Sequence, residues 1–92
     1  MKITIKAFAK YRDYIGNKRE LEISPGETMY TILNRLSRQH KGFGDLIFNQ
    51  DGEVKKGVII LVNGRNIIHL DKLNTRPDHD GVIAIFPPSG GG

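Results

Sequence analysis

Cysteine and tryptophan are both absent from the 92 residues of this chain. Without cysteine there is no disulfide framework, no thiolate nucleophile and no zinc site built on thiolates. The three histidines, His40, His69 and His79, are not spaced as ligands of one metal ion. No glycine-rich segment is followed by the Lys-Ser/Thr pair of a phosphate-binding loop. We therefore expect no metal site, no bound cofactor and no catalytic side chains.

Long hydrophobic runs are missing as well. The two most apolar stretches, residues 58–62 and 82–86, are far too short to cross a bilayer. At the N-terminus, lysines alternate with apolar residues, which is not the pattern of a signal peptide. The sequence thus predicts a cytoplasmic protein with no membrane partner. Its length and its hydrophobic content of 38% suit one small domain that folds alone.

Charge of one sign is not concentrated in any segment. Fourteen Lys and Arg against ten Asp and Glu give a net charge of +4, and the basic residues are dispersed along the chain. Dispersed charges are typical of a solvated surface, whereas a nucleic-acid site has a basic patch or stripe. Nucleic acid is therefore not expected as a partner.

The first half of the chain predicts a hairpin followed by a helix. Residues 2–8 and 19–24 alternate apolar and polar side chains, as half-buried strands do. Thr28 is a plausible N-cap for a helix over residues 29–40. One stripe of that helix is apolar and is expected to face a core: Met29, Ile32, Leu33 and Leu36.

The second half predicts two further strands and a short hairpin. Residues 42–57 show no regular period and are interpreted as irregular. The continuous apolar run 58–62 is typical of a central strand that is buried on both faces. Asn63-Gly64 is a type I′ turn signal, after which residues 65–68 return as a short strand. Residues 82–86 form the last strand, which the following two prolines end.

The resulting β-β-α-β-β order predicts an α+β domain in two layers. It is the order of a ubiquitin-like β-grasp, with a mixed sheet packed on one main helix. We expect this domain to occupy residues 1–88 and to carry a flexible tail over residues 89–92.

The tail is the feature that suggests chemistry. After Pro87 and Pro88 the sequence closes with Ser89 and three glycines: Gly90, Gly91 and Gly92. A terminal carboxylate becomes an electrophile once an enzyme activates it with ATP as an acyl-adenylate. Glycine leaves the acyl carbon unobstructed, because it has no Cβ. The alternative interpretation is an inert glycine-rich extension.

A tail used in this way needs a docking surface on the domain. Ordering its four residues costs on the order of 4–8 kcal/mol of backbone entropy, which the tail alone can hardly offset. Phe8, Ile67 and Phe86 are the candidate contacts, together with Pro87 and Pro88 at the base of the tail. The alternative is that Phe8, Ile67 and Phe86 fill a second, minor core under the 42–57 loop.

Three segments resemble the MoaD/ThiS-type sulfur carriers, most closely the small subunit of molybdopterin synthase. Residues 8–16 (FAKYRDYIG) are similar to that family's Phe-Ala-x-x-Arg-Glu-x-x-Gly segment. Residues 62–67 (VNGRNI) are similar to its Val-Asn-Gly hairpin. Residues 82–88 (VIAIFPP) and the glycines after them are similar to its C-terminus. Three glycines follow Ser89, however, where that family normally ends in two after a variable residue.

The resemblance implies a role. Gly92 would be adenylated by a ubiquitin-activating-like enzyme, which uses the ATP, and converted to a thiocarboxylate. The large subunit of molybdopterin synthase would be the partner, and the sulfur would go to a pterin precursor of the molybdenum or tungsten cofactor. In this role the chain is a non-catalytic subunit apart from its own terminal carboxylate, and Phe8, Ile67 and Phe86 match positions of apolar partner contacts.

Two other hypotheses remain open at this stage. A related branch of ubiquitin-like modifiers joins the same kind of tail to substrate lysines, or uses it to supply sulfur for tRNA thiolation. The third hypothesis is a basic RNA-binding module with an inert tail.

Overall fold

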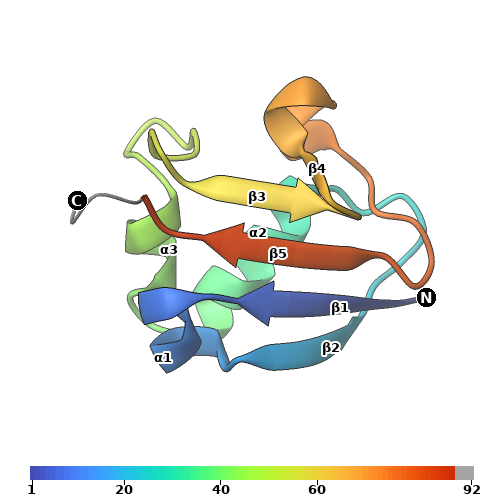
Figure 1. The fold of residues 1–92 in the computed structure, drawn as a ribbon, viewed down its shortest axis with the longest axis horizontal. Helices are drawn as coiled ribbons and strands as arrows, with labels where there is room; N and C mark the ends of the chain where they lie inside the picture. Colours follow the sequence, from blue (N-terminus) through green and yellow to red (C-terminus); the bar gives the residue numbers. More distant parts are fainter. Residues whose placement is uncertain (89–92) are drawn as a thin grey trace.

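A mixed sheet with its main helix on one face makes up the domain (Figure 1). The structure is a computed structural model, and it describes residues 1–88. Within those residues the sheet has five strands in the order β2-β1-β5-β3-β4. The strands are β1 (Lys2–Ala7), β2 (Lys18–Glu22), β3 (Ile59–Val62), β4 (Arg65–Asn66) and β5 (Val82–Phe86). The α-helices are α1 (Arg12–Ile15), α2 (Met29–Gln39) and α3 (Phe43–Ile47); the 3-10 helices are η1 (Ala9–Tyr11), η2 (Ile67–His69) and η3 (Lys72–Asn74). The α+β, ubiquitin-like β-grasp prediction is confirmed.

The first and last strands of the chain lie side by side in the sheet (Figure 1). β1 pairs in parallel with β5, with Ile5 opposite Ile83, and antiparallel with β2. β5 pairs antiparallel with β3, with Ile60 opposite Ile85. Because β5 lies between β1 and β3, the segment that leads to the C-terminus is hydrogen-bonded on both sides.

The helix α2 covers one face of this sheet, as its apolar stripe predicts. Its N-cap is Thr28, whose side chain accepts a hydrogen bond from the backbone N–H of Thr31, and the Thr31 side chain bonds back to the backbone of Thr28. This reciprocal cap satisfies two backbone donors that a helix start otherwise leaves unpaired. The four residues of the predicted apolar stripe of α2 are fully buried. They pack on the sheet face that is turned toward α2, which carries Ile3, Ile5, Ile60, Ile83 and Ile85.

The prediction that residues 58–62 are buried on both faces is wrong. Ile60 and Val62 are buried in β3, but Ile59 is 41% exposed and Leu61 is only half-buried. The reason is that, in the part of the chain described, the helices pack on one side of the sheet. A strand can therefore carry apolar residues on both faces while only one of them is covered.

Residues 42–57 are more regular than the sequence indicates. They contain the short helix α3, whose Phe43 and Ile47 are buried, and an isolated antiparallel bridge between Phe48 and Val54. A five-residue helix is too short to be stable by itself, so packing against α2 stabilises it. The expected loop 42–57 is thus partly helical.

The hairpin at Asn63-Gly64 is confirmed, but its return strand is shorter than expected. Both turn residues have positive φ, 50° and 83°, as a type I′ turn requires. β4 ends at Asn66, and the chain then enters η2 instead of continuing as strand to residue 68. The side chain of Asn66 accepts a hydrogen bond from the backbone N–H of Ile68 and so starts this turn.

Candidate functional site

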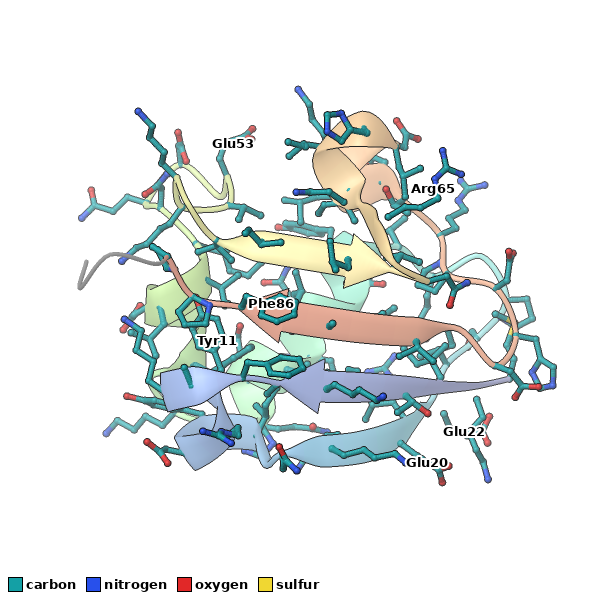
Figure 2. The ribbon with its side chains drawn as sticks, viewed as in Figure 1. Tyr11, Glu20, Glu22, Glu53, Arg65 and Phe86 are labelled. Carbon is teal, nitrogen blue, oxygen red and sulfur yellow. The ribbon has the colours of Figure 1, made fainter. Side chains whose placement is uncertain are left out.

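The sheet face opposite α2 is divided into a charged half and an apolar half. The charged half lies over β1 and β2 and consists of Lys2, Lys6, Lys18, Glu20 and Glu22. The apolar half lies over β5 and β3; with Phe8 it forms what we call the open-face patch: Phe8, Ile59, Leu61, Val82, Ala84 and Phe86. Figure 2 shows Phe86 over the middle of this face and Glu20 and Glu22 along the β2 edge.

Strand register explains why these residues share a face. Ile59 is paired with Phe86 and Leu61 with Ala84, and residues directly opposite in a sheet point to the same side. Ile59, Val82 and Phe8 are exposed, whereas Leu61, Ala84 and Phe86 are partly covered by their neighbours. Exposed apolar surface that is contiguous in this way is typical of an interaction site.

Phe8 and Phe86 stack on one another at the edge of the patch. Their ring centroids are 4.3 Å apart and the rings are only 11° from parallel. The backbone N–H of Phe8 donates to the carbonyl of Ile85 (3.2 Å), which extends the β1–β5 pairing by one residue and fixes Phe8 beside β5. An aromatic pair of this kind contributes about 0.5–1.5 kcal/mol beyond its buried area. The structure thus brings together two of the three predicted docking residues on an open surface.

Ile67 lies elsewhere. It is only 4% exposed and belongs to the core, so its side chain is not on the open face, contrary to the sequence interpretation. The physical reason is the η2 turn that starts at Asn66, which points Ile67 inward and leaves the next residue, Ile68, 61% exposed. The alternative of a minor core is also wrong for Phe8, which remains 37% exposed. Two adjacent isoleucines give no sequence signal as to which one points outward.

The base of the tail lies next to the open-face patch. After β5 ends at Phe86, Pro87 and Pro88 are half-buried. Pro88 borders a surface hollow of about 540 Å³ whose walls include Ile59 and Ile68, with Lys55 and Lys56 from the preceding loop. Ser89 and the predicted reactive glycines, Gly90, Gly91 and Gly92, lie outside the described residues.

The ionisable groups with shifted pKa values are not on the patch. Within residues 1–88 these groups are Tyr11 in the core, Glu22 at the β2 edge and Glu27 before α2. The amino group of Met1 donates to the Glu22 carboxylate (2.9 Å) and lowers its pKa. In the same part of the chain, no cluster of three or more histidine or carboxylate side chains is arranged to hold a metal ion. The patch therefore offers contact area rather than acid–base chemistry.

No helix among the described residues is long and apolar enough to span a bilayer. Cytoplasmic location itself stays a prediction.

Known proteins are similar to this chain over its whole length. Residues 5–92 match the model of the ThiS family. Small archaeal modifier protein 3 of Haloferax volcanii is 32% identical over 93 residues, covering 100% of both chains. The solution structure of a Haloferax volcanii protein superposes with a TM-score of 0.87 at 30% identity, covering 100% of this chain and 87% of that one. A putative molybdopterin converting factor subunit 1 from Pyrococcus furiosus has a TM-score of 0.77 at 23% identity, covering 97% and 99%, a likeness that shows the fold alone.

Proposed function

The chain belongs to the ThiS family, and on this premise we propose that it is a ubiquitin-like carrier protein that acts through its own C-terminus. In this proposal an adenylating, ubiquitin-activating-like enzyme uses ATP to activate Gly92. The patch made by Phe8, Phe86 and their neighbours is the surface on which that enzyme and later partners dock.

One observation supports the proposal most strongly: the open-face patch and the base of the tail are formed by the same strand. Phe86 is the last residue of β5 and stacks on Phe8, and Pro87 and Pro88 follow it directly. A protein bound to the patch is therefore next to the start of the tail. The sequence has four residues beyond Pro88, and at about 3.5 Å each they can reach at most about 14 Å.

The chemistry requires a free carboxylate and no neighbouring side chain. A carboxylate oxygen of Gly92 attacks the α-phosphorus of ATP, the bond between the α-phosphorus and the bridging oxygen breaks, and pyrophosphate leaves. A nucleophile then attacks the acyl carbon and AMP leaves with the electrons of the C–O bond. With a lysine Nζ the product is an isopeptide and a proton is released. With hydrosulfide as the nucleophile the product is a thiocarboxylate. Gly90, Gly91 and Gly92 place no Cβ in the path of either nucleophile.

Our first proposal for the acceptor is a substrate lysine, so that the chain is a small protein modifier. The full-length similarity to small archaeal modifier protein 3 favours this acceptor. The test is mass spectrometry of digested lysate from the organism's own cells. Because Arg76 precedes Pro77, trypsin leaves a long remnant that starts at Leu73. A Ser89→Arg variant is the better probe, since trypsin then leaves only residues 90–92 on the modified lysine.

The result expected is a set of lysines that carry this remnant and lose it when Gly91 and Gly92 are deleted. A complete lack of such lysines, with the variant well expressed and its adenylation demonstrated, contradicts the modifier proposal.

A second candidate function is sulfur donation for molybdopterin synthesis, with the large synthase subunit as partner. The match to the ThiS family and the glycine tail favour it. Sulfur donation for tRNA thiolation uses the same activated form. The test is intact-mass measurement after incubation with the activating enzyme, ATP and a sulfur donor. Sulfur in place of one terminal oxygen, and co-purification of the large subunit, are expected. If only the adenylate and lysine conjugates form, the sulfur-carrier proposal fails.

A further inference from the structure

Gly57 lies against Pro88, at the point where the described part of the chain ends. An ideal Cβ built on Gly57 would be 3.1 Å from the Cβ and 3.2 Å from the Cγ of Pro88. Carbon atoms in ordinary contact are about 3.5–4.0 Å apart. A side chain at position 57 would therefore crowd the proline ring, which would have to move by a few tenths of an ångström.

The turn that contains Gly57 is itself held in place. The backbone N–H of Lys55 donates to the carbonyl of Ile47 (2.8 Å), which ties the turn to α3, and that of Val58 donates to the carbonyl of Lys55 (3.2 Å). Gly57 has a φ of +90°, which a residue with a side chain adopts only with strain. The next residue but one, Ile59, is already paired with Phe86. The turn is therefore a fixed support beside the end of β5.

We propose that this contact, the Gly57–Pro88 seat, sets the direction in which the tail leaves the domain, and that Gly57 is a positioning residue for the activation of Gly92. The inference rests on the proposed function. Proline fixes its own φ near −65°, so a proline ring held by its neighbour fixes the direction of the Cα–C bond that leads out of Pro88. The seat acts at the origin of the tail, whose terminal carboxylate can lie at most about 14 Å further along.

A Cβ at position 57 would displace the Pro88 ring by a few tenths of an ångström. The displacement moves the point from which the terminal carboxylate has to be placed. Misplacing a reacting group by about 1 Å is enough to lower a rate by about 100-fold. A methyl group at position 57 that pushes the proline ring outward should therefore impair activation although it touches no reacting atom.

The chain contains a matched control for the test. Gly52 lies in the same loop and has nearly the same conformation, with a φ of +85°, but a Cβ there would have no atom within 4 Å. Gly52→Ala therefore introduces the backbone strain of a left-handed alanine alone. Gly57→Ala introduces the same strain together with the contact on Pro88.

The experiment measures ATP–pyrophosphate exchange by the purified adenylating enzyme with the full-length wild type, G57A and G52A, after unfolding curves show that all three are folded. We expect G57A to lower kcat by about tenfold or more. The KM of the enzyme for G57A should stay within about twofold of its KM for the wild type, because the open-face patch is intact. G52A should match the wild type in both kcat and KM. The proposal for Gly57 is overturned if G57A changes KM but not kcat. It is also overturned if G57A and G52A lower kcat equally.

A double-mutant cycle with Pro88→Gly then tests whether the two positions act through each other. P88G removes the ring that the new methyl group would meet, so G57A should have no further effect on kcat in the P88G background. Additive losses contradict the proposal. In solution, nuclear Overhauser contacts between the Gly57 Hα and the Pro88 ring should be present in the wild type. Failure of the wild type to support any exchange refutes the proposed function, whereas normal wild-type exchange with an uncoupled cycle refutes the seat alone.

Discussion

Tyr11 packs edge-on against Phe43, with ring centroids 5.9 Å apart and 80° between the ring planes. The contact joins η1, near the start of the chain, to α3. Tyr11 has no exposed surface, and its hydroxyl has no hydrogen-bond partner within residues 1–88. Burial also raises the pKa of this phenol, because the charged form would lose its hydration. The ring of Tyr11 therefore stabilises the core, while its hydroxyl opposes that stabilisation.

Removing that hydroxyl should make the domain more stable. A buried polar group without a partner costs about 1–3 kcal/mol in lost hydration. Tyr11→Phe keeps the ring and its contact with Phe43, so we expect the free energy of unfolding to rise by about 1 kcal/mol in urea titrations. Tyr14→Phe, at a tyrosine that is 37% exposed, is the control and should leave the midpoint unchanged. A loss of stability in Y11F would mean that the hydroxyl has a partner, such as an internal water.

The Phe8–Phe86 pair should contribute to binding as well as to folding. Phe8→Ala removes an exposed aromatic ring from the open-face patch, and truncating an aromatic hot spot of an interface raises Kd by about 30-fold or more. The free energy of unfolding should fall by less than about 3–5 kcal/mol, the cost of a fully buried Phe→Ala change, because Phe8 is 37% exposed. Calorimetry with the purified adenylating enzyme measures the Kd, and urea titration measures the free energy of unfolding. Tyr30→Ala is the control, since Tyr30 is 47% exposed on α2, away from the patch; equal effects of the two variants would refute a role for the patch.

Glu27 should make stability depend on acid pH. Burial raises the pKa of this carboxyl, but hydrogen bonds from Arg35 and from the backbone N–H of Ser24 outweigh it, and the pKa is lowered overall. Because the pKa of Glu27 is lower in the folded state than its ordinary value of 4.5, the charged carboxylate stabilises the fold at pH values above 4.5. That stability is lost as the pH falls through the lower, folded value.

Glu27→Gln should therefore lower stability at neutral pH by about 1–2 kcal/mol, because hydrogen bonds to a charged group are lost. As the pH falls from about 5 to about 2, the curves of E27Q and wild type should converge. Thermal unfolding at several pH values measures both effects. Glu20→Gln is the control, since Glu20 lies on the exposed outer face of β2, and its stability should follow that of the wild type at every pH. If the stabilities of E27Q and wild type instead differ by the same amount across the acid range, Glu27 is not the source of the pH dependence.

The packing of α3 on α2 should not tolerate a side chain at Gly44. A Cβ there would be 2.8 Å from the Oγ and 2.9 Å from the Cβ of Ser37. Gly44→Ala should lower the free energy of unfolding by about 1–3 kcal/mol, the usual effect of overpacking. Ser37→Gly removes both atoms, so G44A should be much less harmful in that background. If G44A is equally destabilising with and without the S37G substitution, α2 and α3 do not pack against each other at Ser37 and Gly44.

The elements that sequence predicts well are those whose local signals agree with their packing. Thr28 and the apolar stripe of α2 define the helix because capping and periodicity point to the same residues. Asn63-Gly64 defines its turn because few other pairs accept two positive φ values. In the alternating segment 2–8, Phe8 has the same parity as Lys2 and Lys6, so the alternation alone places it on their face of the sheet, the open one.

The features that sequence does not predict depend on contacts between distant segments. The short helix α3 forms because Phe43 packs on Tyr11 and Gly44 on Ser37, and neither contact leaves a periodic pattern. An apolar run such as that of β3 reports hydrophobicity, but not whether a helix or a partner protein covers each face. For the same reason, a glycine such as Gly57 is read only as a turn until the structure shows that Pro88 rests on it.

The position of β5 between β1 and β3 has a consequence for how the protein matures. The strand that completes the centre of the sheet is the last one to leave the ribosome, and its parallel partner is the first. Pairing strands from opposite ends of a chain is a slow, non-local step of folding. Until it occurs, the facing edges of β1 and β3 remain unpaired and no fixed support exists for the C-terminus. The contact between Gly57 and Pro88 therefore forms only in a finished domain. An activating enzyme that depends on this contact would discriminate against chains that have not completed folding.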